Sequence, residues 1–561
     1  MNESDVADPG TLRFGVAAAL VFLVVGLAVL DGYGLAWDDA ENLLTGEHYV
    51  RFFTTWDWSW LDFPRYNEIY ATSPDPPPLY NQHFQAAERY PPVANMVAVL
   101  THALFTERLG WLADTDGYHV GVLLFGSLAV LVTVAFTWQA FGPLAGWAAT
   151  LALALYPLFL EHAHLNLKDV PFAALVLLAV WAYWRAVEMQ RWRWLCLSIC
   201  ATGLALGTRL IAAEVWGVMG LAYLPAGWNW LRRWIRERRW HVPPLALRWL
   251  LPHVPLSTLV FLAVWPWLWP DPLGRVRAHV EYSRNVVRGM RVLYAGEIWQ
   301  AGQTLPWHYT LVIFLLTTPL LTLFLGSLGA GVALKRGVRS RNAAALILLV
   351  LFLLALARSS WPTLPQYDGT RHMMDGIVAL AGLCGLGADV LWRWLRQRWP
   401  RFTLSRKAWM SILVLAYLPL VVQLYRLHPY EGVYYNLLAG GVRGTAGRYP
   451  QEYWGSSFRA GCEWINENLP EGAVVLTRVG GRSARYYLRP EVQRIADEDL
   501  PYLPPDQVVY VMYITRVDKY GPIATFADTY LVPIYAVSVE GVPLLKIVRT
   551  DAGTLLQGVS N

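Results

Sequence analysis

Apolar residues gather in runs of about 20 along most of the chain, and these runs stop after about Arg426. A helix of about 20 residues is long enough to cross the roughly 30 Å of hydrocarbon in a bilayer. We therefore predict eleven transmembrane helices, beginning with an uncleaved span at 15–30. The other ten are predicted at 118–140, 143–160, 170–187, 193–208, 210–227, 248–269, 308–330, 342–358, 372–391 and 408–426.

The apolar segment 91–105 is shorter than a span requires, starts with two prolines and contains Asn95 and His102. We interpret it as a helix that lies in the membrane interface. All four Arg-rich loops then fall on the side of the N-terminus, which the positive-inside rule makes cytoplasmic. The opposite, outer side receives the C-terminal tail and the loops at 32–117, 161–169, 270–307 and 359–371.

Residues 428–561 show short helix and strand patterns instead of long apolar runs. We predict a helix at 457–468, a strand at 473–478 and a β-rich run at 507–515. The chain is therefore predicted to form a transmembrane domain at 1–427, whose large outer loop is 32–117, and a small α/β domain at 428–561 outside the cytoplasm.

Composition also indicates a membrane protein, because 55% of the residues are hydrophobic, 16% are charged and the mean hydropathy is +0.32. The net charge of +5 does not indicate nucleic-acid binding, since the Arg residues cluster in short loops between apolar runs. Three of the four cysteines lie in apolar runs and only Cys462 lies in the tail, so neither a disulfide framework nor a zinc cluster is predicted.

Candidate acids lie on the predicted outer face. Asp38 and Asp39 follow the first span directly, and two adjacent carboxylates repel each other, which raises the pKa of one and suits it to accept a proton. Asp169 stands at the outer entry of the span at 170–187. The spacing is equally compatible with a non-functional role for each: Asp38 and Asp39 could simply begin a hydrated loop, and Asp169 could cap a helix. Convergence of the three carboxylates would form an acid/base or cation site.

Cationic candidates lie on the same face: Lys168, Arg209, Arg371 and His372. Guanidinium groups offer paired donors and a permanent charge, which suits a phosphate group. Snorkelling to the interface is the alternative explanation for Arg209, and it is weaker for Arg371, which shares one polar turn with His372.

Aromatic and polar residues that could contact a sugar or an acceptor are His83, Tyr367, Tyr435 and Trp454. Aromatic faces suit sugar stacking, but they also suit the headgroup belt of a membrane. The 29 Trp and 29 Tyr residues therefore do not by themselves indicate carbohydrate.

Four features together resemble a known family: the acids Asp38-Asp39, the Pro-Pro helix after Tyr90, the motif Lys168-Asp169-x-Pro171 and the motif Tyr-Asp-Gly-x-Arg-His at 367–372. Over about residues 12–430 the pattern is similar to the protein O-mannosyltransferase and aminoarabinose transferase superfamily of polytopic membrane glycosyltransferases. The resemblance implies a polyprenyl-phosphate sugar donor and a catalytic role for the first acid of an Asp-Glu pair. Here the second acid is Asp39 instead of Glu, and the resemblance does not extend to the tail.

We therefore expect a glycosyltransferase of the plasma membrane that uses a polyprenyl-phosphate sugar and a protein, lipid or glycan acceptor. Asp38 would deprotonate the acceptor hydroxyl, while Arg371, with Arg209 or Lys168, would stabilise the departing phosphate, with inversion at the anomeric carbon. No cofactor is predicted, and no motif has metal-binding spacing.

Two other classes of function remain open. A transporter or flippase of a lipid or sugar also carries charges in its spans, but it needs them near the membrane midplane. A non-catalytic assembly or sensor protein would use the tail to bind partners and would leave the Asp pair without a role.

Overall fold

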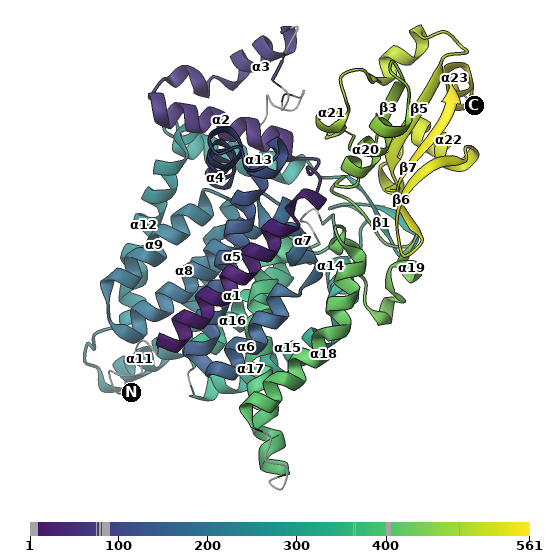
Figure 1. Cartoon of the computed structure of the whole chain (residues 1–561). Coiled ribbons are helices and arrows are strands. Elements are labelled where there is room, and N and C mark those ends of the chain that lie inside the picture. Colours follow the sequence, from purple (N-terminus) through teal and green to yellow (C-terminus); the bar gives the residue numbers. More distant parts are fainter. Residues whose placement is uncertain are drawn as a thin grey trace.

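The computed structural model of the protein describes residues 9–73, 76–77, 80, 90–340, 342–362, 364, 366–399, 405–481 and 483–560. Most of the described chain is helical, and a smaller domain that contains a β-sheet lies beside one end of a helical bundle (Figure 1). The N-terminus and helix α11 (Leu224–Glu237) lie at the opposite end of the bundle.

Three helices form the buried centre of the bundle: α5 (Asp114–Phe141), α8 (Asp169–Met189) and α17 (Met374–Arg398). They are apolar around most of their circumference, as expected for helices enclosed by other helices. Around them lie α1 (Pro9–Ala28), α6 (Pro143–Ala154), α7 (Pro157–Leu165), α9 (Trp192–Leu206), α10 (Glu214–Ala222), α12 (Leu245–Val264), α14 (Tyr309–Thr317), α15 (Leu320–Ser340), α16 (Ala343–Ser359) and α18 (Arg406–Leu427).

Six of the described helices are long and apolar enough to cross a membrane, or eight if each of two bent helix pairs counts as one span. Shorter apolar helices at Arg13–Ala28, Trp192–Leu206 and Ala343–Ser359 coincide with three more predicted spans. The predicted class of helical polytopic membrane protein is confirmed, whereas the number of eleven spans stays a prediction. The segment predicted as one span at 308–330 is divided between α14 and α15, because Pro319 cannot donate a backbone hydrogen bond.

Short helices lie across the end of the bundle that is nearest the sheet domain: α2 (Asp39–Thr55), α3 (Phe63–Thr72), α4 (Val93–His102) and α13 (Pro272–Asn285) (Figure 1). The segment 91–105 is helical, as predicted, and α4 packs between α2 and α5. A π-helical turn, Ala103–Arg108, extends α4. This layer places the start of α2, and with it Asp38, above the ends of the bundle helices.

The C-terminal sheet has the strand order β4-β3-β5-β7-β6, in which β4, β3 and β5 are parallel and the remaining pairs are antiparallel. The predicted helix and the two predicted strand regions are confirmed, with ends that shift by about one residue. The elements are α20 (Phe458–Asn468), β3 (Val474–Arg478), α21 (Ala484–Tyr487), β4 (Gln493–Ile495), β5 (Val508–Ile514), α22 (Pro522–Tyr530), β6 (Pro533–Val539), β7 (Val542–Asp551) and α23 (Ala552–Ser560), preceded by a short α19 (Gly441–Thr445).

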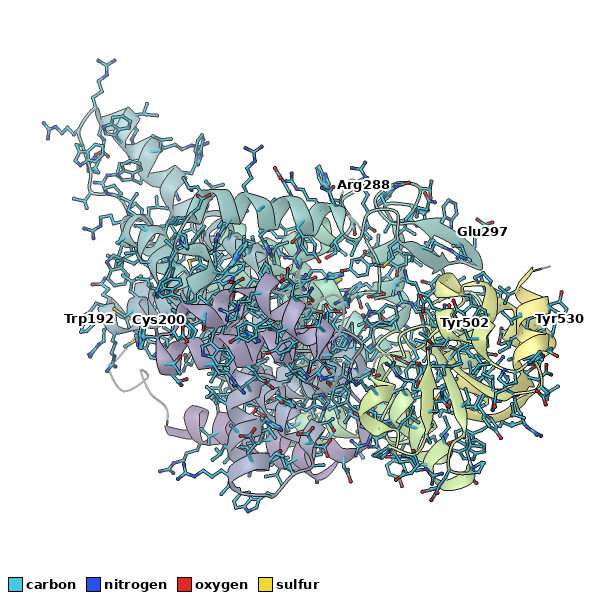
Figure 2. The ribbon with its side chains drawn as sticks, turned by 90° about the horizontal axis from the view of Figure 1, so that it is seen from above. Trp192, Cys200, Arg288, Glu297, Tyr502 and Tyr530 are labelled. Carbon is cyan, nitrogen blue, oxygen red and sulfur yellow. The ribbon has the colours of Figure 1, made fainter. Side chains whose placement is uncertain are left out.

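A hairpin of β1 (Arg291–Tyr294) and β2 (Glu297–Gln300) joins the bundle to the sheet domain. Lys519 Nζ donates a hydrogen bond of 2.8 Å to the carbonyl oxygen of Arg291, and Arg291 donates one of 3.3 Å to the carbonyl oxygen of Tyr520. Seen from above, Tyr502 and Tyr530 mark the sheet domain, whereas Trp192 and Cys200 lie on the far side of the bundle (Figure 2). The hairpin and the sheet domain thus flank the same end of the bundle as α2.

Candidate active site

A cavity of about 700 Å³ lies where the bundle, the layer of short helices and the C-terminal domain meet. Its walls come from segments that are hundreds of residues apart in the sequence. Seven of the residues predicted from the sequence line it: Asp38, Lys168, Arg209, Tyr367, Arg371, His372 and Trp454. The structure thus brings cationic and aromatic candidates together around Asp38, whereas the other two candidate acids, Asp39 and Asp169, do not line the cavity.

Asp38 occupies the residue before α2, but its side chain does not cap that helix. The carboxylate instead reaches toward Lys168, whose Nζ lies 3.5 Å from Asp38 Oδ2. The Lys168 Nζ atom also lies 4.5 Å from the centre of the Tyr90 ring. Both charged side chains keep about a quarter to a third of their surface exposed, 24% for Lys168 and 33% for Asp38. The carboxylate of Asp38 is thus accessible from the cavity.

Asp39 has a different environment from its neighbour. Its side chain is buried, accepts a hydrogen bond of 2.6 Å from the backbone N–H of Ala36, and lies 3.5 Å from His119 Nε2. Burial raises the pKa of Asp39, and repulsion by Asp38 is the smallest of the causes. Asp39 does not line the cavity. Its contacts assign it to the packing of α2 on α5.

Asp169 lies completely buried beneath the cavity and pairs with two arginines. Arg209 donates to one of its carboxylate oxygens, and Arg371 lies 3.5 Å from the other. Helix capping does not explain Asp169, because the side chain of Asn166 accepts the hydrogen bonds from the N–H groups of Lys168 and Asp169. The carboxylate therefore holds two guanidinium groups in place from below.

Arg371 is held between two aromatic rings and two acids. Its guanidinium lies 4.9 Å from the ring centres of both Tyr367 and Trp454, and it pairs with Asp368 at 3.1 Å as well as with Asp169. Only 6% of Arg371 is exposed, so snorkelling to the interface does not explain this residue. Its Nε atom is buried without a hydrogen-bond acceptor among the described residues. The fork of donors is fixed in orientation and faces the cavity.

Arg209 and His372 complete the cationic wall. Arg209 lies between α9 and α10, and one of its nitrogens is 3.2 Å from His372 Nδ1. His372 stacks edge-on against Tyr367, with 4.7 Å between the ring centres. Arg358, at the end of α16, donates to the carbonyl oxygen of His372 over 2.6 Å and pairs with Asp375 at 2.8 Å. These contacts fix the turn that carries Arg371.

Two charged cavity residues from the C-terminal domain were not predicted from the sequence: Arg516 and Lys519. Arg516 is buried, donates to Asp368 and to the carbonyl oxygen of Tyr453, and lies 5.5 Å from the centre of the Trp37 ring. Burial, followed by repulsion from Arg516, lowers the pKa of Lys519 to about 8. The only sequence signal for both is their position just after a strand, where polar residues often serve a site.

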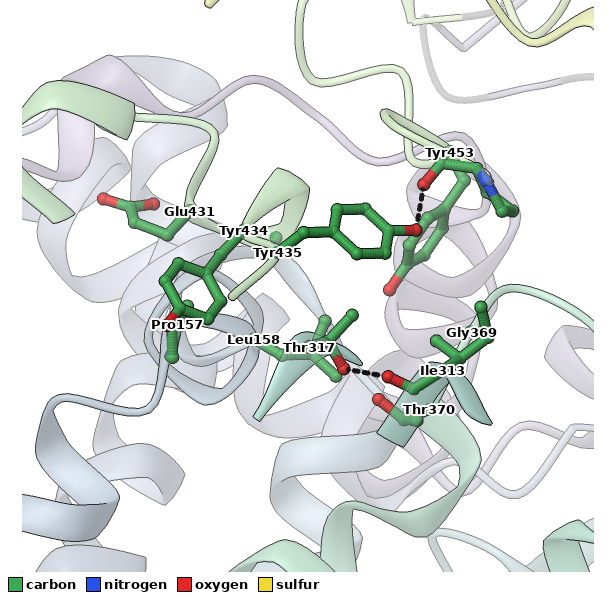
Figure 3. Close-up of a pocket in the computed structure, with 12 residues that line it drawn as sticks. Pro157, Leu158, Ile313, Thr317, Gly369, Thr370, Glu431, Tyr434, Tyr435 and Tyr453 are labelled. Carbon is green, nitrogen blue, oxygen red and sulfur yellow. Dashed lines mark hydrogen bonds between the residues drawn. The ribbon is translucent and has the colours of Figure 1, made fainter. Parts of the chain in front are cut away.

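Tyr435 lies outside the cavity, as Asp39 and Asp169 do. Tyr435 lines a neighbouring pocket of only about 20 Å³, where its hydroxyl donates to the carbonyl oxygen of Pro450 over 2.7 Å (Figure 3). Gly369 and Tyr453 line both this pocket and the large cavity. His83 lies outside the described residues. In the part of the chain that the structure describes, no three His, Cys, Asp or Glu side chains are placed to hold a metal ion.

Comparisons with known proteins agree with the resemblance found in the sequence. Residues 89–269 match the family described as dolichyl-phosphate-mannose-protein mannosyltransferase. This segment includes Lys168, Asp169 and Arg209 of the cavity region. None of the curated proteins compared with the sequence matches it.

Several solved structures match the chain over most of its length. ArnT from Cupriavidus metallidurans in the apo state is 18% identical, with 98% of this chain and 99% of that chain covered and a TM-score of 0.49. The same protein bound to undecaprenyl phosphate is 16% identical, with coverages of 97% and 98% and a TM-score of 0.48. The Archaeoglobus fulgidus oligosaccharyltransferase in the apo form is 11% identical, with coverages of 87% and 64% and a TM-score of 0.45.

The match of residues 89–269 runs from the start of the predicted interfacial helix to the end of the span predicted at 248–269. The predicted resemblance to the polytopic membrane glycosyltransferases is thereby confirmed, and with it the class of enzyme, a glycosyltransferase.

Proposed function

We propose that the protein transfers a sugar from a polyprenyl-phosphate donor to an acceptor hydroxyl on the outer face of the membrane, with Asp38 as the base. The observation that carries this proposal is the presence of opposite charges in one cavity. Asp38 and the guanidinium groups of Arg209 and Arg371 all line it. The family that matches residues 89–269 is named for a polyprenyl-phosphate sugar donor, which supports the same donor class here.

The cationic wall suits the phosphate of the donor. Arg371 is held by Asp169 and Asp368 and by two aromatic rings, so little conformational freedom is lost when it binds an anion. Its planar guanidinium group can donate two parallel hydrogen bonds to phosphate oxygens. The N-termini of α8 and α17 lie beside Asp169 and His372, and their positive dipole ends favour negative charge at the same place.

The acidic wall suits a one-step displacement. Asp38 would accept the proton of the acceptor hydroxyl while the hydroxyl oxygen forms a bond with the anomeric carbon. The bond from that carbon to the phosphate oxygen breaks, and its electron pair leaves with the phosphate, which Arg209 and Arg371 stabilise. Because the attack comes from the side opposite the phosphate, the anomeric configuration would be inverted. Lys168, 3.5 Å from Asp38, would hold the carboxylate in place before the reaction.

The position of the charges favours an enzyme over a transporter. Asp169 is the first residue of α8, Arg371 precedes α17, and Arg358 is next to the last residue of α16. All three therefore lie at helix ends that meet the layer of short helices, whereas a transporter places its charges midway along its spans.

The donor proposal can be tested on the purified full-length protein. Wild-type protein should bind a polyprenyl phosphate, and should bind the uncharged polyprenol of the same length at least about 10-fold more weakly, because charged hydrogen bonds would be lost. Incubation with polyprenyl-phosphate hexoses and a membrane extract that supplies acceptors should release polyprenyl phosphate. Equal affinity for the two lipids, or net movement of the lipid across vesicles with no sugar released, would contradict the proposal and favour a flippase.

A further inference from the structure

A second pocket, of about 200 Å³, lies next to the large cavity and shares one residue with it. It is lined by Trp37, Thr477, Arg478, Val479, Gly480, Gly481 and Arg494, and Trp37 also lines the large cavity. Trp37 directly precedes Asp38 in the chain, so consecutive Cα atoms place the two residues about 3.8 Å apart. The two pockets thus meet at Trp37, the residue before the proposed base.

The sheet topology places this pocket where α/β domains commonly bind ligands. After β3 the chain forms β4 on one side of β3, and then returns to form β5 on the other side. The strand order changes direction between β3 and β5, and a crevice opens at the carboxyl ends of parallel strands at such a switch point. Arg478 ends β3, and residues 479–481 follow it; all four line the small pocket, whereas Arg516 and Lys519 follow β5 and line the large cavity.

The sequence after β3 allows the sheet edge to approach Trp37 closely. Gly480 has φ of +90°, and a Cβ atom at this position would lie 2.4 Å from Cε3 of Trp37. Any other residue at 480 would displace the indole or the loop. The absence of a side chain at Gly480 therefore allows the loop after β3 to pack directly on Trp37.

The charge of the pocket identifies the chemistry of its ligand. Two arginines are among the lining residues, and none of the described lining residues is acidic. Arg478 pairs with Asp497 at 2.8 Å, whereas none of the ion pairs found among the described residues involves Arg494. Among the described residues, the pocket thus offers one guanidinium group that forms no ion pair, beside one that pairs with Asp497, and this suits a carboxylate or a phosphate group.

We propose that this pocket is the acceptor subsite, and that the acceptor is a glycan carrying a carboxylate or phosphate close to the hydroxyl that receives the sugar. This inference rests on the proposed function. Arg494 and Arg478 hold the anionic group, and the indole of Trp37 forms an apolar wall for the sugar ring that connects it to the hydroxyl. The hydroxyl then lies on the Asp38 side of Trp37, opposite the cationic wall that holds the donor.

The test measures binding of small probes to the full-length protein in detergent. D-glucuronate and D-glucose 6-phosphate should bind at least about 10-fold more tightly than neutral D-glucose, because only the first two can form charge-assisted hydrogen bonds. The double variant Arg478→Gln/Arg494→Gln, and Arg494→Gln alone, should lose this preference. Arg549→Gln is the matched control, because Arg549 is exposed on β7 of the same sheet and does not line the pocket.

Several results would overturn the inference. Equal binding of glucose and glucuronate, or an unchanged preference in both variants, would exclude an anion subsite. Binding of inorganic phosphate as tight as that of glucose 6-phosphate would exclude the glycan part. Loss of polyprenyl phosphate binding in the double variant would assign the pocket to the donor instead. Failure of the wild-type protein to bind polyprenyl phosphate would refute the proposed function and not the anion subsite.

Discussion

Replacement of Asp169 by Asn tests whether this buried carboxylate only stabilises the fold or also orients Arg209 and Arg371 to bind the donor. The substitution keeps the shape of the side chain and removes the charge that balances Arg209 and Arg371. Removing one partner of a buried ion pair typically costs about 3–5 kcal/mol. Arg209 keeps 26% of its side chain exposed, so we expect a value near the lower end, about 3 kcal/mol of unfolding free energy.

The matched control is Asp389→Asn. Asp389 also pairs with an arginine, Arg393, at 2.7 Å, but it lies near the other end of α17 and its partner is half exposed. An ion pair of this kind contributes about 0–1 kcal/mol, so this variant should remain nearly as stable as the wild type. Polyprenyl phosphate affinity should fall in Asp169→Asn, because the two guanidinium groups lose their fixed orientation, and should be unchanged in Asp389→Asn.

Unfolding can be followed with a thiol-reactive dye once the exposed Cys196 and Cys200 are replaced by Ser, since Cys384 in the bundle and Cys462 in the C-terminal domain are both buried. The reasoning would be refuted if Asp169→Asn unfolded within about 1 kcal/mol of the wild type and bound polyprenyl phosphate normally. Loss of stability together with normal affinity would show that Asp169 supports the fold without orienting the donor site.

Three more predictions follow from the same geometry. Arg371→Lys and Arg371→Ala should both weaken polyprenyl phosphate binding, because an ammonium group lacks the planar fork; normal affinity and turnover in both would remove Arg371 from the donor site. Since Lys519 loses its proton near pH 8, affinity for polyprenyl phosphate should fall as the pH rises through about 8, and Lys519→Gln should abolish this step; a step that persists in Lys519→Gln belongs to another group. Folding stability should change in the opposite sense, rising from about pH 8 toward the ordinary pKa of lysine, because the unfolded chain binds the extra proton there. In intact cells, a cysteine at Tyr502, which is 88% exposed, should label from outside and one at Trp234 should not; the reverse result would invert the predicted topology.

The apolar runs predicted the helical membrane class and the outline of the C-terminal domain, because each depends on the local pattern of residues. The same pattern identified Lys168, Arg209 and Arg371, since polar residues that flank spans at one face of a membrane must lie near one another. The predicted side of the membrane for each terminus, and the division of the chain at 427/428, stay predictions.

What the sequence could not show depends on long-range packing. Successive residues at a helix start point about 100° apart, so the sequence alone could not decide which of Asp38 and Asp39 faces the cavity. Arg516 pairs with Asp368 across 148 positions of the chain, and no local pattern indicates that contact. Asp169 could be a helix cap or an ion-pair partner by spacing alone, and the position of Asn166 decides between the two. Tyr435 shares its aromatic character with Tyr367, but it is turned into a small separate pocket.

The central claim, that Asp38 is the base for sugar transfer, is tested most directly by Asp38→Asn in the purified full-length protein. General-base catalysis contributes about 10²–10⁴-fold, so transfer of sugar from a polyprenyl-phosphate donor should fall by that factor. Donor affinity and thermal stability should stay close to those of the wild type, and the matched variant Asp39→Asn should lose less activity because Asp39 does not line the cavity. Transfer by Asp38→Asn at a rate near that of the wild type would contradict the account.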